Sequence, residues 1–191
     1  MISSYEKNNY GPLLRSLSEN CVTSLAVELG VLHGYSTEYI AWGVLGKGRL
    51  MAYDLFEEYE YNHSKFNDIR VKFLNFGDTV KLIQGDAFKA HNDFEDASVG
   101  FLHVDLSNTG DIIKEIINNW NNKIAQRGII VFEGGSFVRD NIEWMKKYNK
   151  SPIRAELENN KIINEQYLWG VFEAYPSMTV MYKKEEKHAT E

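Results

Sequence analysis

The stretch that decides the fold covers residues 27–36 and reads VELGVLHGYS. A valine-rich run ends with an acid at Glu28, glycines follow at Gly30 and Gly34, and Ser36 closes the stretch. Glycine lacks a Cβ atom, so the chain can turn tightly there and a ligand can lie against its peptide planes. The pattern indicates a buried strand that leads through a binding loop into a helix. At the start of that helix, the serine hydroxyl and the free amides can hold an anion.

Short apolar segments with strand character alternate with segments of helical periodicity along the rest of the chain. The expected strands cover residues 24–30, 49–56, 79–88, 98–107 and 127–135. The expected helices cover residues 13–20, 36–46, 63–77, 110–125 and 137–149. Pro12 opens the first of them, Ser136 caps the last one, and Pro152 stops it. This alternation predicts an α/β protein with a parallel sheet that is covered by helices on both faces.

The order of elements changes near the C-terminus. Residues 167–175 and 178–184 are separated by Pro176 and Ser177, which is the pattern of a hairpin, so we expect at least one antiparallel strand there. We predict one domain over residues 1–182 and a disordered polar tail over 183–191. Within the domain, residues 1–22 form an N-terminal helical segment that serves as a lid or as a dimer contact.

The composition fits one globular domain and argues against several partners. The chain has 191 residues with 43% hydrophobic residues, which is enough for a continuous core and a small-molecule pocket. Its net charge of −6, without a cluster of basic residues, argues against nucleic acid. Cys21 is the only cysteine, so no internal disulfide can form. No stretch approaches the roughly 20 apolar residues of a membrane helix, and we expect a cytoplasmic protein without a membrane partner.

The expected strand ends carry acids that suit a nucleoside. In an open parallel sheet, the ligand lies at the carboxyl ends of the strands where the strand order reverses. Asp54 ends the second strand, where an acid can accept hydrogen bonds from both ribose hydroxyls. Asp86 follows the third strand, and its carboxylate together with the amide of Ala87 can select adenine.

Two common phosphate loops do not fit this stretch. A dinucleotide loop, G-x-G-x-x-G, would need glycine where the chain has Leu32 and Tyr35. A phosphate loop needs G-x-x-x-x-G-K-[ST], and residues 43–48 have the wrong spacing for it. Glu28 would repel a pyrophosphate but suits a ligand with an ammonium and a sulfonium group. The glycine loop, the ribose acid and the adenine acid together indicate S-adenosylmethionine.

The same residues resemble a known family. Residues 28–36 spell E-L-G-V-x-x-G-Y-S, which is similar to the first motif of class I S-adenosylmethionine-dependent O-methyltransferases of the catechol and caffeoyl-CoA type. The GDA at 85–87 and the strand ends at Asp105 and Glu133 follow in the order of that family's later motifs. Over residues 24–135, the resemblance implies a Rossmann-like three-layer αβα sandwich with a seven-stranded sheet whose final strand is antiparallel. It also implies methyl transfer to an oxygen of a small-molecule acceptor. The candidate cofactor contacts are Glu28, Gly30, Gly34, Ser36, Asp54, Asp86, Ala87 and Asp105.

The chain departs from this family at the active centre. The family usually has a lysine three residues after the fourth-strand acid and Asp-Asn at the end of the fifth strand. This chain has Asn108, and Glu133 followed by Gly134. An amide cannot serve as a general base. Two alternatives therefore stay open: a catalytically impaired cofactor-binding module, and a metal-free methyltransferase acting on nitrogen or carbon.

The candidate catalytic residues are Asp105, Glu133 and His33. Asp105 and Glu133 end strands that we expect to be neighbours about 4.8 Å apart, so both carboxylates could share one Mg²⁺. Asp105 could instead contact the methionine end of the cofactor or cap the next helix. His103 lies on the same strand face as Asp105, and we expect a buried, hydrogen-bonded structural role for it. A chain of this length leaves the pocket open or has it completed by the partner in a homodimer.

Overall fold

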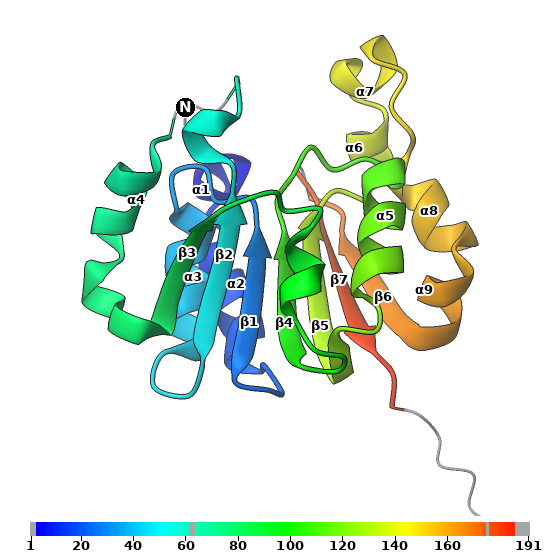
Figure 1. Ribbon diagram of the computed structural model, residues 1–191. Helices are drawn as coiled ribbons and strands as arrows, with labels where there is room; N and C mark the ends of the chain where they lie inside the picture. Colours follow the sequence, from blue (N-terminus) through cyan, green and yellow to red (C-terminus); the bar gives the residue numbers. More distant parts are fainter. Residues whose placement is uncertain (1–2, 62–63, 175, 186–191) are drawn as a thin grey trace, which may run out of the picture.

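A computed structural model describes residues 3–61, 64–174 and 176–185. Seven strands form its central sheet in the order β3-β2-β1-β4-β5-β7-β6 (Figure 1). The strands are β1 (Leu25–Leu29), β2 (Arg49–Asp54), β3 (Val80–Gln84), β4 (Val99–Val104), β5 (Ile124–Glu133), β6 (Tyr167–Phe172) and β7 (Met178–Lys183). The neighbours from β3 to β5 pair in parallel, whereas β7 is antiparallel to both β5 and β6. The predicted seven-stranded sheet with an antiparallel C-terminal hairpin strand is confirmed.

Helices cover both faces of this sheet (Figure 1). They are α1 (Ser4–Lys7), α2 (Gly11–Glu19), α3 (Tyr35–Val44), α4 (Phe66–Lys72), α5 (Gly110–Trp120), α6 (Phe137–Asp140), α7 (Glu143–Lys147), α8 (Ile153–Asn159) and α9 (Lys161–Gln166). Short 3₁₀ turns lie at Phe56–Glu58, Leu74–Thr79 and Ala90–Asp93. The predicted three-layer α/β architecture is therefore confirmed.

Each face of the sheet has its own apolar core, because successive strand residues point to opposite sides. On one face, Val27 and Leu102 pack with Ile113 of α5 and with α8 and α9. On the other, Ala26 and Phe101 pack with α1 to α4. Glu28 and His103 lie two residues after Ala26 and Phe101 on the same strands, so their side chains point to this second face. Tyr5 of α1 packs against His103 there.

Two predicted helices are shorter than expected. The helix predicted over 110–125 ends at Trp120, because Ile124 already pairs with Val99 and opens β5. The helix predicted over 63–77 begins at Phe66 and gives way to a 3₁₀ turn after Lys72. His63, at its expected start, lies outside the described residues.

The segment predicted as one helix over 137–149 contains two. Ser136 caps α6 as expected, since its hydroxyl accepts a hydrogen bond from the Arg139 amide at 3.0 Å. The helix then stops, because Ile142 adopts an extended conformation before α7. The carboxylate of Asp140 accepts hydrogen bonds from the amides of Ile153 (3.0 Å) and Arg154 (2.7 Å), which open α8. Asp140 thus joins the end of α6 to a helix that the sequence analysis did not predict.

The C-terminal boundary also differs from the expected one. Lys183, placed in the predicted tail, belongs to β7, and its ammonium donates to the carbonyl oxygens of Asn121 (2.6 Å) and Ile124 (2.9 Å). The remainder of that expected tail from residue 186 lies outside the described residues. No helix of the described ranges is both long and apolar enough to cross a membrane.

We expect Asp140→Ala to lower the free energy of unfolding by about 1–3 kcal/mol, because the buried amide of Ile153 and the partly buried amide of Arg154 lose their acceptor at the start of α8. Urea denaturation measures this change. The control is Asp111→Ala, at an exposed acid of α5, which should change the stability by less than about 0.5 kcal/mol. Equal effects of the two substitutions would contradict the role given to Asp140.

Candidate active site

The site is built where β1 and β4 lie side by side at the reversal of strand order. Gly30 follows β1 with φ +93°, and a Cβ atom there would lie 2.1 Å from the carbonyl oxygen of Asp105. Hydrogen bonds from the Gly30 amide to Tyr53 O and from the Asp105 amide to Leu29 O, both 2.8 Å, hold the strand ends together. Only glycine fits this contact, because any side chain would separate the two strand ends.

Asp54 fixes the loop that follows Gly30. Its Oδ2 accepts hydrogen bonds from the amides of Val31 (2.8 Å) and Leu32 (3.0 Å), and its Oδ1 accepts one from the Phe56 amide (2.7 Å). Leu32 has φ +50°, a conformation that costs free energy for a branched side chain. The carboxylate therefore holds a strained turn in place, in addition to lining the pocket described next.

A large pocket of about 560 Å³ opens above these strand ends. Its walls combine the backbone of the glycine loop, three carboxylates, several apolar side chains and three serines. The lining residues are Ser3, Ser4, Gly30, Val31, Leu32, Asp54, Leu55, Tyr59, Tyr61, Asp86, Ala87, Phe88, Asp105, Leu106, Ser107 and Ile112. The volume is in the range of cofactor and small-ligand pockets.

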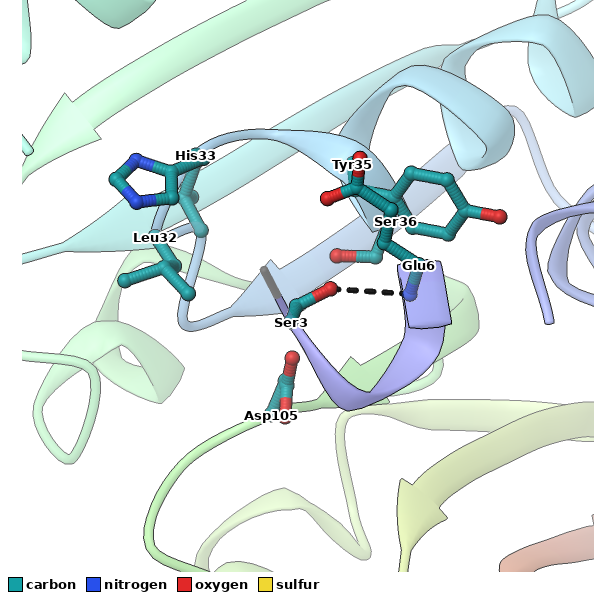
Figure 2. A pocket seen from close by; sticks show the side chains of 8 residues that line it. Ser3, Glu6, Leu32, His33, Tyr35, Ser36 and Asp105 are labelled. Atoms are coloured by element: carbon teal, nitrogen blue, oxygen red, sulfur yellow. Dashed lines mark hydrogen bonds between the residues drawn. The ribbon is translucent and has the colours of Figure 1, made fainter. Parts of the chain in front are cut away.

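A small hollow lies next to the large pocket, between α1 and the loop (Figure 2). It has a volume of about 10 Å³, and Ser3, Val31, Leu32 and Asp105 line both cavities. The two cavities therefore adjoin each other at Asp105.

Asp105 lies at this junction as a half-buried carboxylate. Burial raises its pKa from the ordinary value of 3.8 to about 7, against the lowering effect of His103. The nearby carboxylates of Glu133 and Glu28 raise the pKa further. A pKa near 7 is typical of a carboxyl group that can take part in acid–base chemistry at neutral pH.

Glu133, the other expected metal ligand, is bound to protein groups. It accepts a hydrogen bond from the Ser4 hydroxyl and pairs with Arg139, whose Nε lies 3.4 Å from Oε1. Across residues 3–61, 64–174 and 176–185, no group of three or more side chains has the arrangement of a metal site. A guanidinium beside Glu133 disfavours a second cation, so the residues present do not fit the expected Mg²⁺ site with Asp105.

The position of the family's lysine is occupied by Asn108, as the sequence shows. Its amide nitrogen donates to the carbonyl oxygens of Val104 (3.1 Å) and Glu133 (3.2 Å). The residue is 1% exposed. The side chain of Asn108 thus links the ends of β4 and β5, because its amide donates to one backbone carbonyl oxygen of each strand.

The side chain of Glu28 is fully buried, and it lines neither of the two cavities. Its Oε1 is 3.0 Å from His103 Nδ1, and the two residues face each other in the pairing of β1 with β4. The ring of Tyr5 packs edge-on against His103 with 5.2 Å between ring centres. Burial raises the pKa of Tyr5 well above its ordinary value, so this phenol stays neutral. The buried, hydrogen-bonded role expected for His103 is confirmed, and the same contact gives Glu28 a structural partner.

The remaining predicted loop residues lie at or near the start of α3. Gly34 precedes α3 with φ +82°. A Cβ atom there would lie 2.8 Å from the ring of Phe73. Ser36 is the second residue of α3 and lines the hollow, as does His33. His33 Nδ1 lies 2.8 Å from the hydroxyl of Ser64.

The predicted adenine residues lie in the large pocket. Asp86 and Ala87 follow β3 in its lining, and Asp86 Oδ1 accepts a hydrogen bond from the Phe88 amide at 3.0 Å. The structure thus brings Asp54, Asp86 and Asp105 to one cavity, as the strand-end pattern predicted.

Several lining residues were not predicted. Ser3 and Ser4 come from the N-terminal segment, and no local pattern connects that segment with the loop. Ile112 of α5 also lines the pocket. Tyr59 and Tyr61 also line the pocket, and they are 46% and 71% exposed.

A family model described as a methyltransferase domain matches residues 27–133. The match covers more than half of the chain, so the chain belongs to this family of methyltransferase domains. The class I resemblance found in the loop motif is thereby confirmed. The comparison with curated protein sequences gives no match.

Solved structures share the fold at low sequence identity. A protein from Corynebacterium glutamicum has 15% identity and a TM-score of 0.72 over 94% of this chain and 82% of that one. The O-methyltransferase TomG from Streptomyces achromogenes, involved in tomaymycin synthesis and solved with S-adenosylmethionine, has 14% identity and a TM-score of 0.71 over 96% and 82%. The methyltransferase PaMTH1 from Podospora anserina, solved with S-adenosylhomocysteine, has 15% identity and a TM-score of 0.65 over 92% and 78%.

We expect Glu28→Ala to lower the free energy of unfolding by about 3 kcal/mol, because it leaves His103 buried without its partner. Chemical denaturation measures the loss. Glu38→Ala removes an exposed acid from α3 and serves as the matched control. If Glu28→Ala were as stable as that control, the buried pair would have no structural role.

We expect Asp105→Asn to stabilise the protein, and more at high pH than at low pH. The folded protein holds the Asp105 proton more tightly than the unfolded chain, since the pKa is about 7 instead of 3.8. Ionising this group in the folded state therefore costs free energy that grows as the pH rises from about 4 to about 7. The gain should be about 1–4 kcal/mol at pH 8 and small at pH 4. Thermal denaturation at both pH values tests this, and an equal gain at both would contradict it.

Proposed function

We propose that the protein is a methyltransferase that moves a methyl group from S-adenosylmethionine to a hydroxyl oxygen of a small-molecule acceptor. The observation that carries the proposal is the pocket in which the bare loop at Gly30 meets the carboxylates of Asp54 and Asp86. A nucleoside needs these features in this order: a backbone it can lie against, an acid for the ribose and an acid for the adenine amino group.

The residues at the site fit this cofactor. In this proposal Asp54 accepts hydrogen bonds from ribose hydroxyls, and Asp86 with the Ala87 amide reads the adenine edge, while Leu55 and Phe88 give the pocket apolar walls. The net charge of the pocket lining is negative, which suits a sulfonium. The solved methyltransferase PaMTH1 with S-adenosylhomocysteine supports the choice of cofactor, and the O-methyltransferase TomG with S-adenosylmethionine supports both this choice and oxygen as the acceptor atom.

When bound, S-adenosylmethionine supplies an electrophilic methyl group on sulfur. The main task of the protein is then to align the acceptor behind that methyl group, because correct alignment alone can lower a barrier by up to about 7–11 kcal/mol. The acceptor hydroxyl must also lose its proton. We propose Asp105 as the proton acceptor, since it lies in the pocket and its pKa of about 7 leaves it partly ionised at neutral pH. Glu133 and His33 are the other candidates, and their contacts with Arg139 and Ser64 make them less suited.

A cofactor-binding module without transfer activity is the second candidate. The observation that favours it is Asn108, whose amide joins two backbone carbonyls at the place of the family's lysine. Such a module would bind the cofactor and methylate no acceptor. Transfer to nitrogen or carbon without a metal is the remaining alternative from the sequence.

Titration calorimetry with S-adenosylhomocysteine tests the cofactor assignment. We expect binding of this ligand and none of NAD at the same concentration. Asp54→Ala should weaken binding by about 10- to 100-fold, since it removes a ribose acceptor and releases the Val31 and Leu32 amides. The control Asp68→Ala, at an exposed acid of α4, should bind normally. Tight binding of NAD without a response to S-adenosylhomocysteine would refute the proposal.

Transfer of a labelled methyl group separates the enzyme from the module. The acceptors are catechols, phenols, sugar hydroxyls and amines, offered with and without Mg²⁺. Methylation of a hydroxyl acceptor that Asp105→Asn abolishes supports the proposed enzyme. Cofactor binding without transfer to any acceptor supports the module, and transfer to amines alone supports the nitrogen alternative.

A further inference from the structure

The strand β6 forms one edge of the central sheet, where β7 is its neighbour among the described strands (Figure 1). Sheet edges are usually protected by charged side chains, proline or a bulge, because their open backbone groups pair readily with another strand. The opposite edge has such protection, since the exposed Lys81 lies within β3. The six residues of β6, Tyr167–Phe172, are all uncharged, contain no proline and pair with β7 in one unbroken register. This edge is therefore open to pairing.

The side chains of β6 alternate between a covered and an open face of the sheet. Trp169 and Val171 pack against the core on the side of α8 and α9. Leu168 and Phe172 point to the other face, where they are 61% and 50% exposed, and Gly170 lies between them. The helices on that face, α1 to α4, thus leave an apolar end of the sheet uncovered.

The hydrogen-bond pattern indicates which backbone groups of β6 point away from β7. The Lys184 amide donates to the Gln166 carbonyl oxygen at 2.8 Å, one step beyond the register of the two strands. Hydrogen-bonded and non-hydrogen-bonded pairs alternate along an antiparallel ladder, so Gly170 is bonded to β7 while the amides and carbonyls of Trp169 and Val171 point to the open edge. Among the described residues, these groups make no backbone hydrogen bond outside the sheet.

We propose that β6 pairs in antiparallel orientation with β6 of a second copy of this chain, about a twofold axis that passes between the two Gly170 residues. In this register, Trp169 of each copy faces Val171 of the other, and the backbone groups at the open edge bond to one another. Leu168 of each copy then faces Phe172 of the other on the uncovered face, which gives two apolar cross-strand pairs. The seven strands of each copy join into one continuous sheet.

The glycine at the centre of β6 suits this pairing. Gly170 would form a non-hydrogen-bonded pair with its own copy, in which the Cα atoms approach to about 4.5 Å. A Cβ atom at Gly170 would meet nothing within 4 Å in the described chain, so the packing of one copy does not require glycine here. Glycine within a strand often marks the close approach of another backbone. The apolar residues lie at equal steps on both sides of it, so the strand is complementary to a second copy of itself.

Analytical ultracentrifugation of the full chain over a range of concentrations tests the pairing, independently of any methyl transfer. We expect a dimer that dissociates in the micromolar range, as suits a small interface. Gly170→Lys places two like charges opposite each other and should raise the dissociation constant about 10-fold, as should Gly170→Glu. A mixture of these two variants should restore the dimer, because opposite charges then face each other. The control Asn75→Lys adds the same charge at an exposed site in the turn before β3 and should leave the dimer unchanged.

Amide hydrogen exchange of the unsubstituted protein tests the same contact without a substitution. We expect the amides of Trp169 and Val171 to exchange more slowly as the protein concentration rises, since pairing protects them. A dimer in which the exchange of these two amides does not depend on concentration would place the interface elsewhere and overturn the proposal.

The outcomes of the ultracentrifugation decide between the possible partners of β6. Recovery of the dimer in the mixture alone, with each variant folded by circular dichroism, supports the twofold axis at Gly170. An unsubstituted protein that stays monomeric at all concentrations overturns the proposal, and this includes the case in which β6 pairs with an extended peptide of another protein. A dimer that both Gly170 variants retain, or one that the mixture does not restore, contradicts this register.

Discussion

The site depends on the close approach of two strand ends, which only Gly30 permits. A Cβ atom at this position would lie 2.1 Å from the carbonyl oxygen of Asp105, so a side chain would force β1 and β4 apart. The same approach leaves the backbone of the loop exposed to the pocket, and Asp54 holds that loop by accepting from two of its amides. The close approach of Gly30 to Asp105 thus allows both the packing of β1 against β4 and the access of a ligand to the loop backbone.

The acids around this contact differ in what surrounds them. Glu28 is paired with His103 inside the sheet, and Glu133 is paired with Arg139 at the end of β5. Asp105 has no cation of this kind at its carboxylate among the described residues, and burial raises its pKa to about 7. A carboxylate that is held at a cost in stability and faces a cavity is typical of a functional position. The expected magnesium pair is not supported, because one of its two members already has a cation.

The sequence was sufficient for residues whose place follows from the order of the strands along the chain. Gly30 and Gly34 and the acids at strand ends could be predicted because a parallel sheet brings the ends of its strands to one edge. The seven strands followed from their apolar runs. The partner of Glu28 could not be predicted in the same way, because the pattern showed its place near the loop but not the direction of its side chain.

The unpredicted parts depend on contacts between distant segments. The break between α6 and α7 accompanies the contact of Asp140 with α8, and the closing of the site by α1 depends on Tyr5 and Ser4 meeting β4 and β5. Helix periodicity and capping patterns carry no information on such contacts. The N-terminal segment shows the consequence most clearly: its residues read as a short helix, and the structure places them on the wall of the candidate site.

A crystal structure of the protein with S-adenosylhomocysteine tests the central claim most directly. The account predicts the nucleoside above Gly30, with its ribose at Asp54 and its adenine at Asp86. A complex in which the ligand lies elsewhere, or in which the cavity above Gly30 holds only solvent, would contradict it.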